Sequence, residues 1–464
     1  MKRTFLFMNI MLAAGVCSAM PASAQQAHEA TLAGHAYLQA DTFVPIPDDA
    51  PDALGVAAKF AGPDNLRTEQ LGSIETSSFM SANGAPRLTD ADRPHAGQPV
   101  QGFSGIKPAG DGAYYVMADN GFGNKANSPD AMLMVHKVAP DWDRGEVELE
   151  EAIYLKDPNK VVPFQLTNEN TGTRYLTGAD FDPESFQIVE NADGETRFWF
   201  GDEFGPYLFA TTPEGVITDF HQVRVGGEIV RSPDHFALKL PTEPDGSVDF
   251  SVRRSRGLEG MAASPDGETL YPMFEGPLYR DGGYESSEEG HYLRIVEFDV
   301  SEGAFTGRSF KYQLEQDGLS IGDFNMIDDN SALVIERDWG EGVPAQACEG
   351  APTADCFNKP AQFKRVYTIS FEGVEDGGFV KKLGYIDLMN IQDPNDKAVL
   401  GGEGDRFTFP LVTIEDVHMV DDRHIIVGND NNYGVSMGRK LGAQDHNELI
   451  LLETPGLLQQ ALQD

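Results

Sequence analysis

Residues 257–278, GLEGMAASPDGETLYPMFEGPL, contain the pattern from which the fold of this chain can be inferred. A Gly-Leu-Glu-Gly entry centred on Glu259 is followed by a Pro-Asp-Gly turn and a short apolar strand, residues 269–274. Asp-Gly readily adopts the positive φ angles of tight hairpin turns. The strand ends on Glu275, and a carboxylate at the end of a buried strand needs a partner. We therefore expect a strand–turn–strand unit that presents an acidic side chain.

The same unit recurs along the chain, each time with a Gly- or Asp-containing turn before an apolar strand. The further strands are 114–118, 197–201, 332–335 and 424–428, which end on Asp119, on Asp202 and Glu203, on Glu336, and just before Asp430. These strand-end acids are about 78 residues apart on average, a scale typical of the blades of β-propellers.

This spacing predicts an all-β fold, a six-bladed β-propeller that forms a single domain over residues 25–464. The sixth blade is expected from residues 25–98, completed by a C-terminal strand at 448–453. Helical turns are expected only at 183–189 and 456–463.

The N-terminus predicts export. Lys2 and Arg3 precede an apolar run at 5–16 and an Ala-Ser-Ala site, the pattern of a secretory signal peptide cleaved after Ala24. The mature protein is therefore expected to be periplasmic or secreted, and no later stretch is apolar enough to span a membrane. The net charge of −39 argues against nucleic acid and anionic membranes as partners, and we expect a monomer.

Two cysteines follow the predicted signal peptide, Cys348 and Cys356. In an exported protein a pair this close is expected to form a disulfide that staples a loop. Ligation of a metal by the two thiols is the alternative.

Equivalent positions of propeller blades converge at one mouth of the central channel, so the recurring acids are expected to meet there. Crowded, partly buried carboxylates cannot all stay ionised unless cations bind them, and calcium prefers such oxygen ligands. Alternatively, these acids only satisfy backbone N–H groups in turns. The acids expected at the mouth are Asp119, Asp180, Asp202, Glu203, Glu259, Glu275, Asp323, Glu336, Asp416 and Asp430, with Asn120, Asn325 and Asn431 as neutral oxygen donors.

Basic side chains beside these acids would suit a phosphate ligand, whose charge metals and arginines can share. Arg256 precedes the Gly-Leu-Glu-Gly entry, Arg337 follows a strand-end acid, and Lys125 follows the 114–118 strand. Each arginine could instead pair only with its neighbouring acid. His418 is a candidate acid or base, or a structural histidine. The sequence has no G-x-S-x-G elbow, phosphate loop, H-E-x-x-H motif or complete EF-hand loop.

The order of several motifs resembles the phytase-like domain family, exported bacterial proteins described as having esterase-like activity of the phytase family. The segments that carry this resemblance are GFSGI from 102, MADNGFGNKANSPD from 117, GDEFGPYLF from 201, RGLEGMAASPDG from 256, VIERD from 334 and GNDNN from 428. The resemblance implies a propeller and a calcium-dependent hydrolase of phosphoesters, in which metal ions and basic side chains hold phosphate while a metal-bound water attacks.

The leading hypothesis is therefore an exported calcium-dependent hydrolase of small-molecule phosphoesters. A second hypothesis keeps calcium but takes a lactone or aryl ester as substrate, with an acid or His418 as the base. A third is a propeller that binds a ligand without catalysis. In the leading hypothesis the calcium ligands are Asp119, Asp202, Glu203, Glu259, Glu336 and Asp430, the catalytic residues are Glu259, Glu336 and His418, and the substrate-binding residues are Arg256, Arg337 and Lys125.

Overall fold

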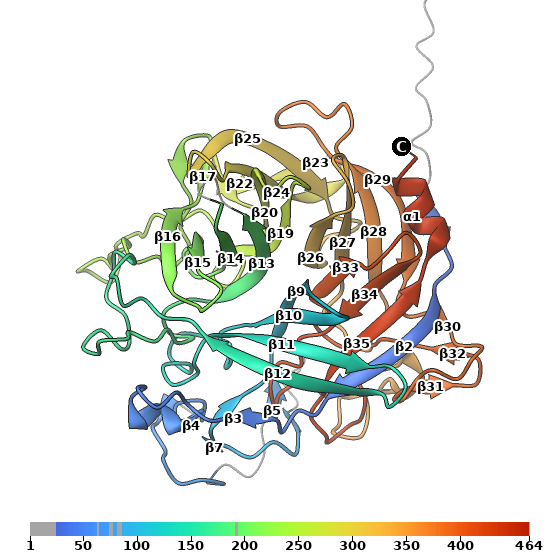
Figure 1. Cartoon of the computed structure of the whole chain (residues 1–464), viewed down its shortest axis with the longest axis horizontal. Helices are drawn as coiled ribbons and strands as arrows, with labels where there is room; N and C mark the ends of the chain where they lie inside the picture. Colours follow the sequence, from blue (N-terminus) through green and yellow to red (C-terminus); the bar gives the residue numbers. More distant parts are fainter. Residues whose placement is uncertain (1–24, 63–64, 74–77, 81–85, 191–193, 464) are drawn as a thin grey trace, which may run out of the picture.

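The computed structural model describes residues 25–463, apart from 63–64, 74–77, 81–85 and 191–193. Within these residues, five antiparallel sheets of four strands are arranged around a centre, like the blades of a propeller (Figure 1). The prediction of an all-β propeller is confirmed. The predicted signal peptide, residues 1–24, lies outside the described residues.

Each blade begins with its innermost strand, and the innermost strands lie side by side in a closed ring. From the inside outward, the blades are β9 (Phe103–Gly110), β10 (Ala113–Ala118), β11 (Met134–Asp141) and β12 (Glu146–Tyr154); β13 (Pro183–Glu190), β14 (Thr196–Asp202), β15 (Tyr207–Thr211) and β16 (Ile217–Gln222); β19 (Leu258–Ala263), β20 (Thr269–Phe274), β24 (Gly290–Asp299) and β25 (Ala304–Gln313); β26 (Ser320–Met326), β27 (Ser331–Arg337), β28 (Lys364–Ser370) and β29 (Lys381–Asp387); and β33 (Asp416–Met419), β34 (His424–Gly428), β35 (Asn447–Glu453) and β2 (Thr31–Leu38).

The predicted number of blades is wrong, because the described residues form five blades instead of six. The N-terminal region supplies β2, which pairs along its length with the C-terminal strand β35, from Thr31 opposite Glu453 to Leu38 opposite Asn447. It also supplies β1 (Gln26–His28), which adds a short parallel strand to the outer edge of the fourth blade beside β29. The expected pairing of the N-terminal region with the C-terminal strand is therefore present, but it completes the fifth blade. Pairing between the two ends of the chain closes the ring.

The rest of the N-terminal region, between β2 and β9, forms small two-stranded sheets at one side of the propeller (Figure 1). It is joined to the blades by polar contacts, such as the hydrogen bond from the backbone N–H of Lys59 to Asp130, 2.9 Å long. Its elements are β3 (Phe43–Val44) with β8 (Gln98–Pro99), β4 (Val56–Ala57) with β7 (His95–Ala96), β5 (Ser78–Met80) with β6 (Pro86–Leu88), and a 3-10 turn at Asp52–Gly55.

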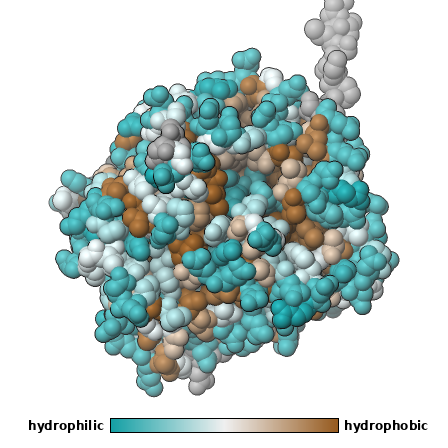
Figure 2. Space-filling model, viewed as in Figure 1, coloured by the Kyte–Doolittle hydropathy of each residue, from teal (hydrophilic) through white to brown (hydrophobic). Residues whose placement is uncertain are grey.

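The hydrophobic core lies between neighbouring blades. One cluster joins Met117 and Val135 of the first blade to Phe186 and Phe200 of the second, and all four are buried. Burying a side chain of this size stabilises the fold by about 1.5–3 kcal/mol. Similar clusters join the third blade to the fourth and the fourth to the fifth, so each blade depends on its neighbours. The surface in view is mainly hydrophilic (Figure 2).

Minor elements complete the chain. The helix expected at 456–463 is present as α1 (Pro455–Ala461), but the helical turn expected at 183–189 is wrong, because these residues form β13. The Cys348–Cys356 disulfide is confirmed, and no helix among the described residues is long and apolar enough to cross a membrane. The remaining elements are β1 (Gln26–His28), β17 (Arg224–Val225), β18 (Glu228–Ile229), β21 (Tyr279–Arg280), β22 (Gly283–Tyr284), β23 (Ser286–Ser287), β30 (Ile391–Gln392), β31 (Gly402–Glu403), β32 (Arg406–Phe407) and a 3-10 turn at Pro344–Gln346.

Candidate functional site

The beginnings of the innermost strands carry β-bulges that aim acidic side chains at one end of the ring. In β13, Pro183 pairs with Asp202 and Ser185 with Gly201, which leaves Glu184 as the extra residue. In β19, Leu258 pairs with Phe274 and Gly260 with Met273, so Glu259 is the extra residue of a second bulge. A bulge bends its strand and re-aims the side chain of the extra residue. Both carboxylates consequently lie beside Glu203, which follows β14.

The second strands of the blades supply another ring of side chains at the same end. In each of the first four blades, one residue at the mouth end of the second strand lies next to the bulge of the innermost strand. This residue is Asp119 in the first blade, Glu203 in the second, Glu275 in the third and Arg337 in the fourth. Asp430 follows β34 of the fifth blade. The strand-end acids Asp119, Glu203, Glu275 and Asp430 therefore meet at one mouth. In the fourth blade the corresponding position holds Arg337 instead of an acid.

We call this the acidic mouth. Its members interact electrostatically with one another, and most are buried. They are Asp119, Asp182, Glu184, Glu203, Glu259, Glu275, Glu415 and Asp430.

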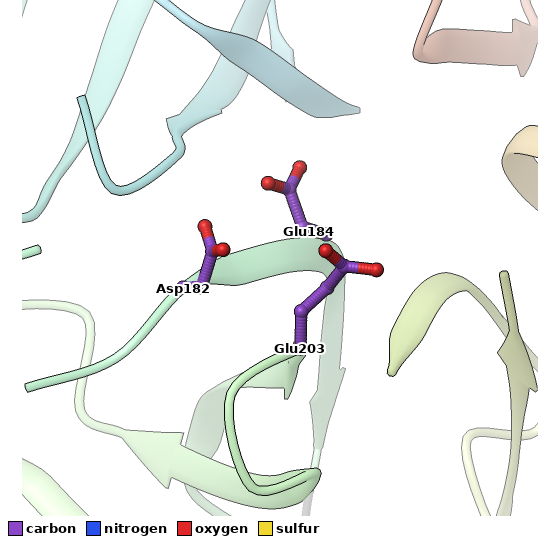
Figure 3. Close-up of side chains that lie close together, drawn as sticks. All are labelled: Asp182, Glu184 and Glu203. Carbon is purple, nitrogen blue, oxygen red and sulfur yellow. The ribbon is translucent and has the colours of Figure 1, made fainter. Parts of the chain in front are cut away.

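Two groups of three carboxylates within the acidic mouth could each hold a metal ion. Asp182, Glu184 and Glu203 lie close together, with one oxygen of each within 4.8 Å of the others (Figure 3). Glu203 forms a second such group with Glu259 and Glu275. Asp182 is 2 % exposed and Glu203 is 4 % exposed, yet one carboxylate oxygen of each has no hydrogen-bond partner within the described residues. Buried polar atoms are normally satisfied, so these oxygens indicate a missing partner.

Burial and mutual repulsion raise the pKa values of these carboxyl groups. The pKa of Asp182 is raised well above its ordinary value by burial and then by the charge of Asp119. The pKa values of Glu203 and Glu259 are raised in the same way, by burial and then by Glu275. Without cations, the acidic mouth must therefore take up protons, and a bound cation would favour the ionised forms instead.

Two arginines partly balance this charge. The buried guanidinium of Arg337 lies 2.7 Å from Glu415, 3.5 Å from Glu259 and 3.8 Å from Glu275. Arg256 forms an ion pair with Glu275. Both guanidinium groups also lie against the ring of Trp339, 4.7 Å from its centre for Arg256 and 4.4 Å for Arg337.

Other sequence-predicted residues border the mouth without belonging to it. Asp202 accepts hydrogen bonds from the backbone N–H groups of Asp182 (2.8 Å) and Gly205 (2.7 Å), and burial raises its pKa to about 6. The Nζ atom of Lys125 lies 4.9 Å from the ring centre of Phe204. Its positive charge favours the ionised form of Asp202 and so partly offsets the rise in the pKa of that group. Asp180 accepts backbone N–H hydrogen bonds in a local turn, as the turn-acid alternative expects. Asp323 and Asp416 lie within innermost strands, near Lys107, and accept backbone N–H hydrogen bonds from the neighbouring innermost strands.

Glu336 lies apart from the acidic mouth. Side chains alternate along a strand, so Glu336 and Arg337 point to opposite sides of β27. Glu336 accepts hydrogen bonds from the hydroxyl of Tyr312 (2.7 Å) and from Lys382 (2.5 Å). Its charge is therefore satisfied within the fold, away from the carboxylates with which it was expected to bind calcium.

His418 also lies elsewhere, at the opposite end of the innermost strands. It lines a pocket of about 480 Å³ together with Lys107, Gln187 and Asn325. Burial and the charge of Lys107 lower its pKa to about 3, so it is neutral at ordinary pH. His418 and the acidic mouth do not share a site in the described structure.

The sequence interpretation missed Asp182 and Glu184. It selected Asp180 as the acid of the segment GADFDPESF, but Asp180 caps a local turn through Thr167 and Thr177. The signal was available from aligning the starts of the innermost strands. In that alignment Asp182-Pro183-Glu184 corresponds to Gly257-Leu258-Glu259.

Comparison with known sequences matches most of the chain to one family. The sequence model of the Phytase-like family, described as "Esterase-like activity of phytase", matches residues 98–433. An "Uncharacterized secreted protein" of Arthroderma benhamiae is 26% identical over 274 residues, 52% of this chain and 51% of that protein. The chain therefore spans about half the length of this curated relative.

Comparison with solved structures finds matches of low identity and low score. A GH43 β-1,3-galactosidase has a TM-score of 0.37 at 11% identity, with 77% of this chain and 91% of that chain covered. The propeller of Dos1 has a TM-score of 0.27 at 6% identity, with coverage of 82% and 72%. These scores are below 0.5, so the assignment of the fold depends on the strand topology.

Proposed function

Because the chain belongs to the Phytase-like family, which indicates a hydrolase, we propose that it is a calcium-dependent hydrolase of phosphoesters whose active site is the acidic mouth. The observation that carries this proposal is the pair of buried, unpartnered oxygens on Asp182 and Glu203. The secreted relative and the signal-peptide pattern of residues 1–24 support an exported enzyme, periplasmic or secreted.

The donor set of the acidic mouth fits calcium. Its candidate ligands are carboxylate oxygens, and calcium takes six to eight oxygens in flexible geometry. When bound, such an ion would neutralise the carboxylates, attract a phosphate oxygen and make water more acidic. In this proposal Glu203 would hold the ion together with Asp182 and Glu184 or together with Glu259 and Glu275.

The arginines would bind and orient the substrate. Arg337 is held by Glu415 and stacked on Trp339, which fixes its guanidinium beside Glu259. Arg256 is partly exposed and borders a pocket of about 260 Å³ that also includes Trp339 and Glu275. A phosphate entering from this pocket would meet the guanidinium of Arg256, and guanidinium forks match phosphate oxygens well.

A carboxylester or lactone is the second candidate substrate. Both arginines already pair with carboxylates, which leaves less positive charge for a phosphate. The words "esterase-like activity" in the family description also favour an ester. In that case calcium would polarise a carbonyl oxygen, and a carboxylate of the mouth would act as the base.

Turnover by the chelator-stripped exported chain, with and without calcium, tests these proposals. The substrates would be p-nitrophenyl phosphate, its diester and p-nitrophenyl acetate. Calcium-restored release from the phosphates supports the leading proposal, and release from the acetate alone supports the ester. Glu259→Gln should abolish the calcium response, whereas Glu214→Gln, a change of an exposed turn residue, should preserve it. Silence on all three substrates would favour a propeller that binds its ligand without catalysis.

A further inference from the structure

Glu203 is shared by the two candidate metal groups of the acidic mouth. One group contains Asp182 and Glu184 from the start of the second blade, and the other contains Glu259 and Glu275 from the third blade. Glu203 thus lies at the junction between two blades, with a carboxylate oxygen that has no partner in the described structure. A carboxylate has two oxygens, so it can serve one ion on each side.

The charge distribution differs between the two groups. Within the described residues, the salt bridges of Arg256 and Arg337 reach Glu259 and Glu275 but not Asp182 or Glu184. In the described structure the group of Asp182 therefore has no cationic side chain in a salt bridge, whereas Glu259 and Glu275 of the other group pair with arginines. Cation affinity rises with the charge of the ligands, so the two groups should differ in affinity.

The charge of the whole mouth is also too large for a single divalent ion. If all eight carboxylates were ionised, the two guanidinium groups would leave a net charge of about −6, and one divalent ion would reduce it only to about −4. Burial makes such an excess costly, because like charges in a buried site repel strongly and force protonation. A second ion would let more of these carboxylates stay ionised.

We propose that the acidic mouth binds a pair of divalent cations bridged by the carboxylate of Glu203. The tighter ion lies among Asp182, Glu184 and Glu203, and the weaker ion lies among Glu203, Glu259 and Glu275. The inference rests on the proposed metal-dependent function of this mouth. Paired ions bridged in this way are about 3.5–4 Å apart in hydrolases of phosphoesters.

The number of ions and their coupling test this proposal. Metal analysis and calorimetric titration of the chelator-stripped exported chain with calcium should give two equivalents that bind in two steps. With manganese in place of calcium, electron paramagnetic resonance should show an exchange-coupled pair. One equivalent only, or two equivalents without exchange coupling, would overturn the proposal even if every variant failed to fold.

Matched variants assign the two sites. Asp182→Asn should weaken the tight step at least tenfold and leave one weak step, whereas Glu203→Gln should weaken both steps and remove the exchange coupling. Glu214→Gln should match the unchanged chain in stoichiometry and coupling. Unchanged coupling in a folded Glu203→Gln variant would contradict the bridging role.

These results are separable from the test of function. Two coupled ions without any turnover would refute the proposed hydrolase and leave the paired site intact. Calcium-dependent turnover with a single bound ion would refute the paired site and leave the proposed function intact.

Discussion

The two ends of the central channel are built from the same innermost strands but treat charge in opposite ways. At the end of Lys107, the lysine donates a hydrogen bond to Asn325, whose amide donates in turn to Asp323 over 2.8 Å. At the acidic mouth, Asp182 and Glu203 keep unpartnered buried oxygens. At the first end a buried lysine serves two carboxylates, Asp323 and Asp416, although one oxygen of Asp416 also lacks a partner in the described structure. At the second end the group of Asp182, Glu184 and Glu203 has no cationic side chain in a salt bridge among the described residues, and its oxygens need a partner from outside. The difference separates a structural polar network from a candidate binding site.

The largest expected effect is a loss of stability when Lys107, at the channel end opposite the acidic mouth, is replaced. Lys107→Met would leave Asp323 and Asp416 buried without their nearest cation, which should reduce the free energy of unfolding by about 3–5 kcal/mol. Chemical denaturation of the chelator-stripped chain measures this change. A loss below about 1 kcal/mol would mean that Lys107 does not stabilise the buried carboxylates of Asp323 and Asp416.

Calcium should have the next largest effect, through the acidic mouth. Calcium at about 100 times its dissociation constant should stabilise the folded chain by about 2.7 kcal/mol, because the unfolded chain lacks the site. Thermal denaturation with and without calcium measures this gain. Asp182→Asn should reduce the gain, and it should leave the Tm of the metal-free chain unchanged or about 1–3 °C higher because it removes repulsion. A metal-free variant that is strongly destabilised would instead indicate that Asp182 is structural.

The pH dependence of the metal-free chain should reveal the same repulsion. Burial raises the pKa of Asp119 to about 6, and burial together with neighbouring acids raises those of Asp182 and Glu259 well above their ordinary values. These values exceed those of the unfolded chain, so the folded chain binds more protons. The contribution to stability is complete below pH of about 4 and is lost as the pH rises through 6 and above. Melting curves across this range should show the decline, and calcium should remove most of it.

The smallest effect is expected at His418, which lies at the end opposite the acidic mouth. His418→Gln should change calcium-dependent turnover by less than about twofold, since this side chain cannot reach a substrate bound at the acidic mouth. Steady-state rates on the substrate that the protein turns over provide the measurement. A hundredfold loss of turnover in a folded variant would indicate that His418 is a catalytic base, and it would contradict the assignment of the two ends to different roles.

Much of the propeller could be predicted because turns and strands leave local signals. The strands expected at 269–274 and 424–428 have the observed bounds, and the expected convergence of Asp119, Glu203 and Asp430 at one mouth is present. The number of blades could not be obtained from average spacing. The N-terminal region adds length but forms no blade of its own, because it contributes only β2 to the fifth blade and the short edge strand β1 to the fourth.

The details of the site depend on register, which the sequence alone did not define. Glu336 and Arg337 were both expected at the mouth, but alternation along β27 allows only one of two neighbours to face it. Glu184 faces Glu203 because of a bulge in β13, and Asp182 precedes that bulge. The bulge depends on the register in which β13 pairs with the next strand, β14, and the segment that contains Asp182 and Glu184 does not by itself define this register.

Anomalous diffraction from crystals soaked in manganese would test the contrast between the two ends most directly. The account predicts strong peaks among Asp182, Glu184, Glu203 and Glu259, and none beside Lys107 and Asn325. An acidic mouth without a peak at saturating manganese would contradict it, as would metal bound only at the opposite end.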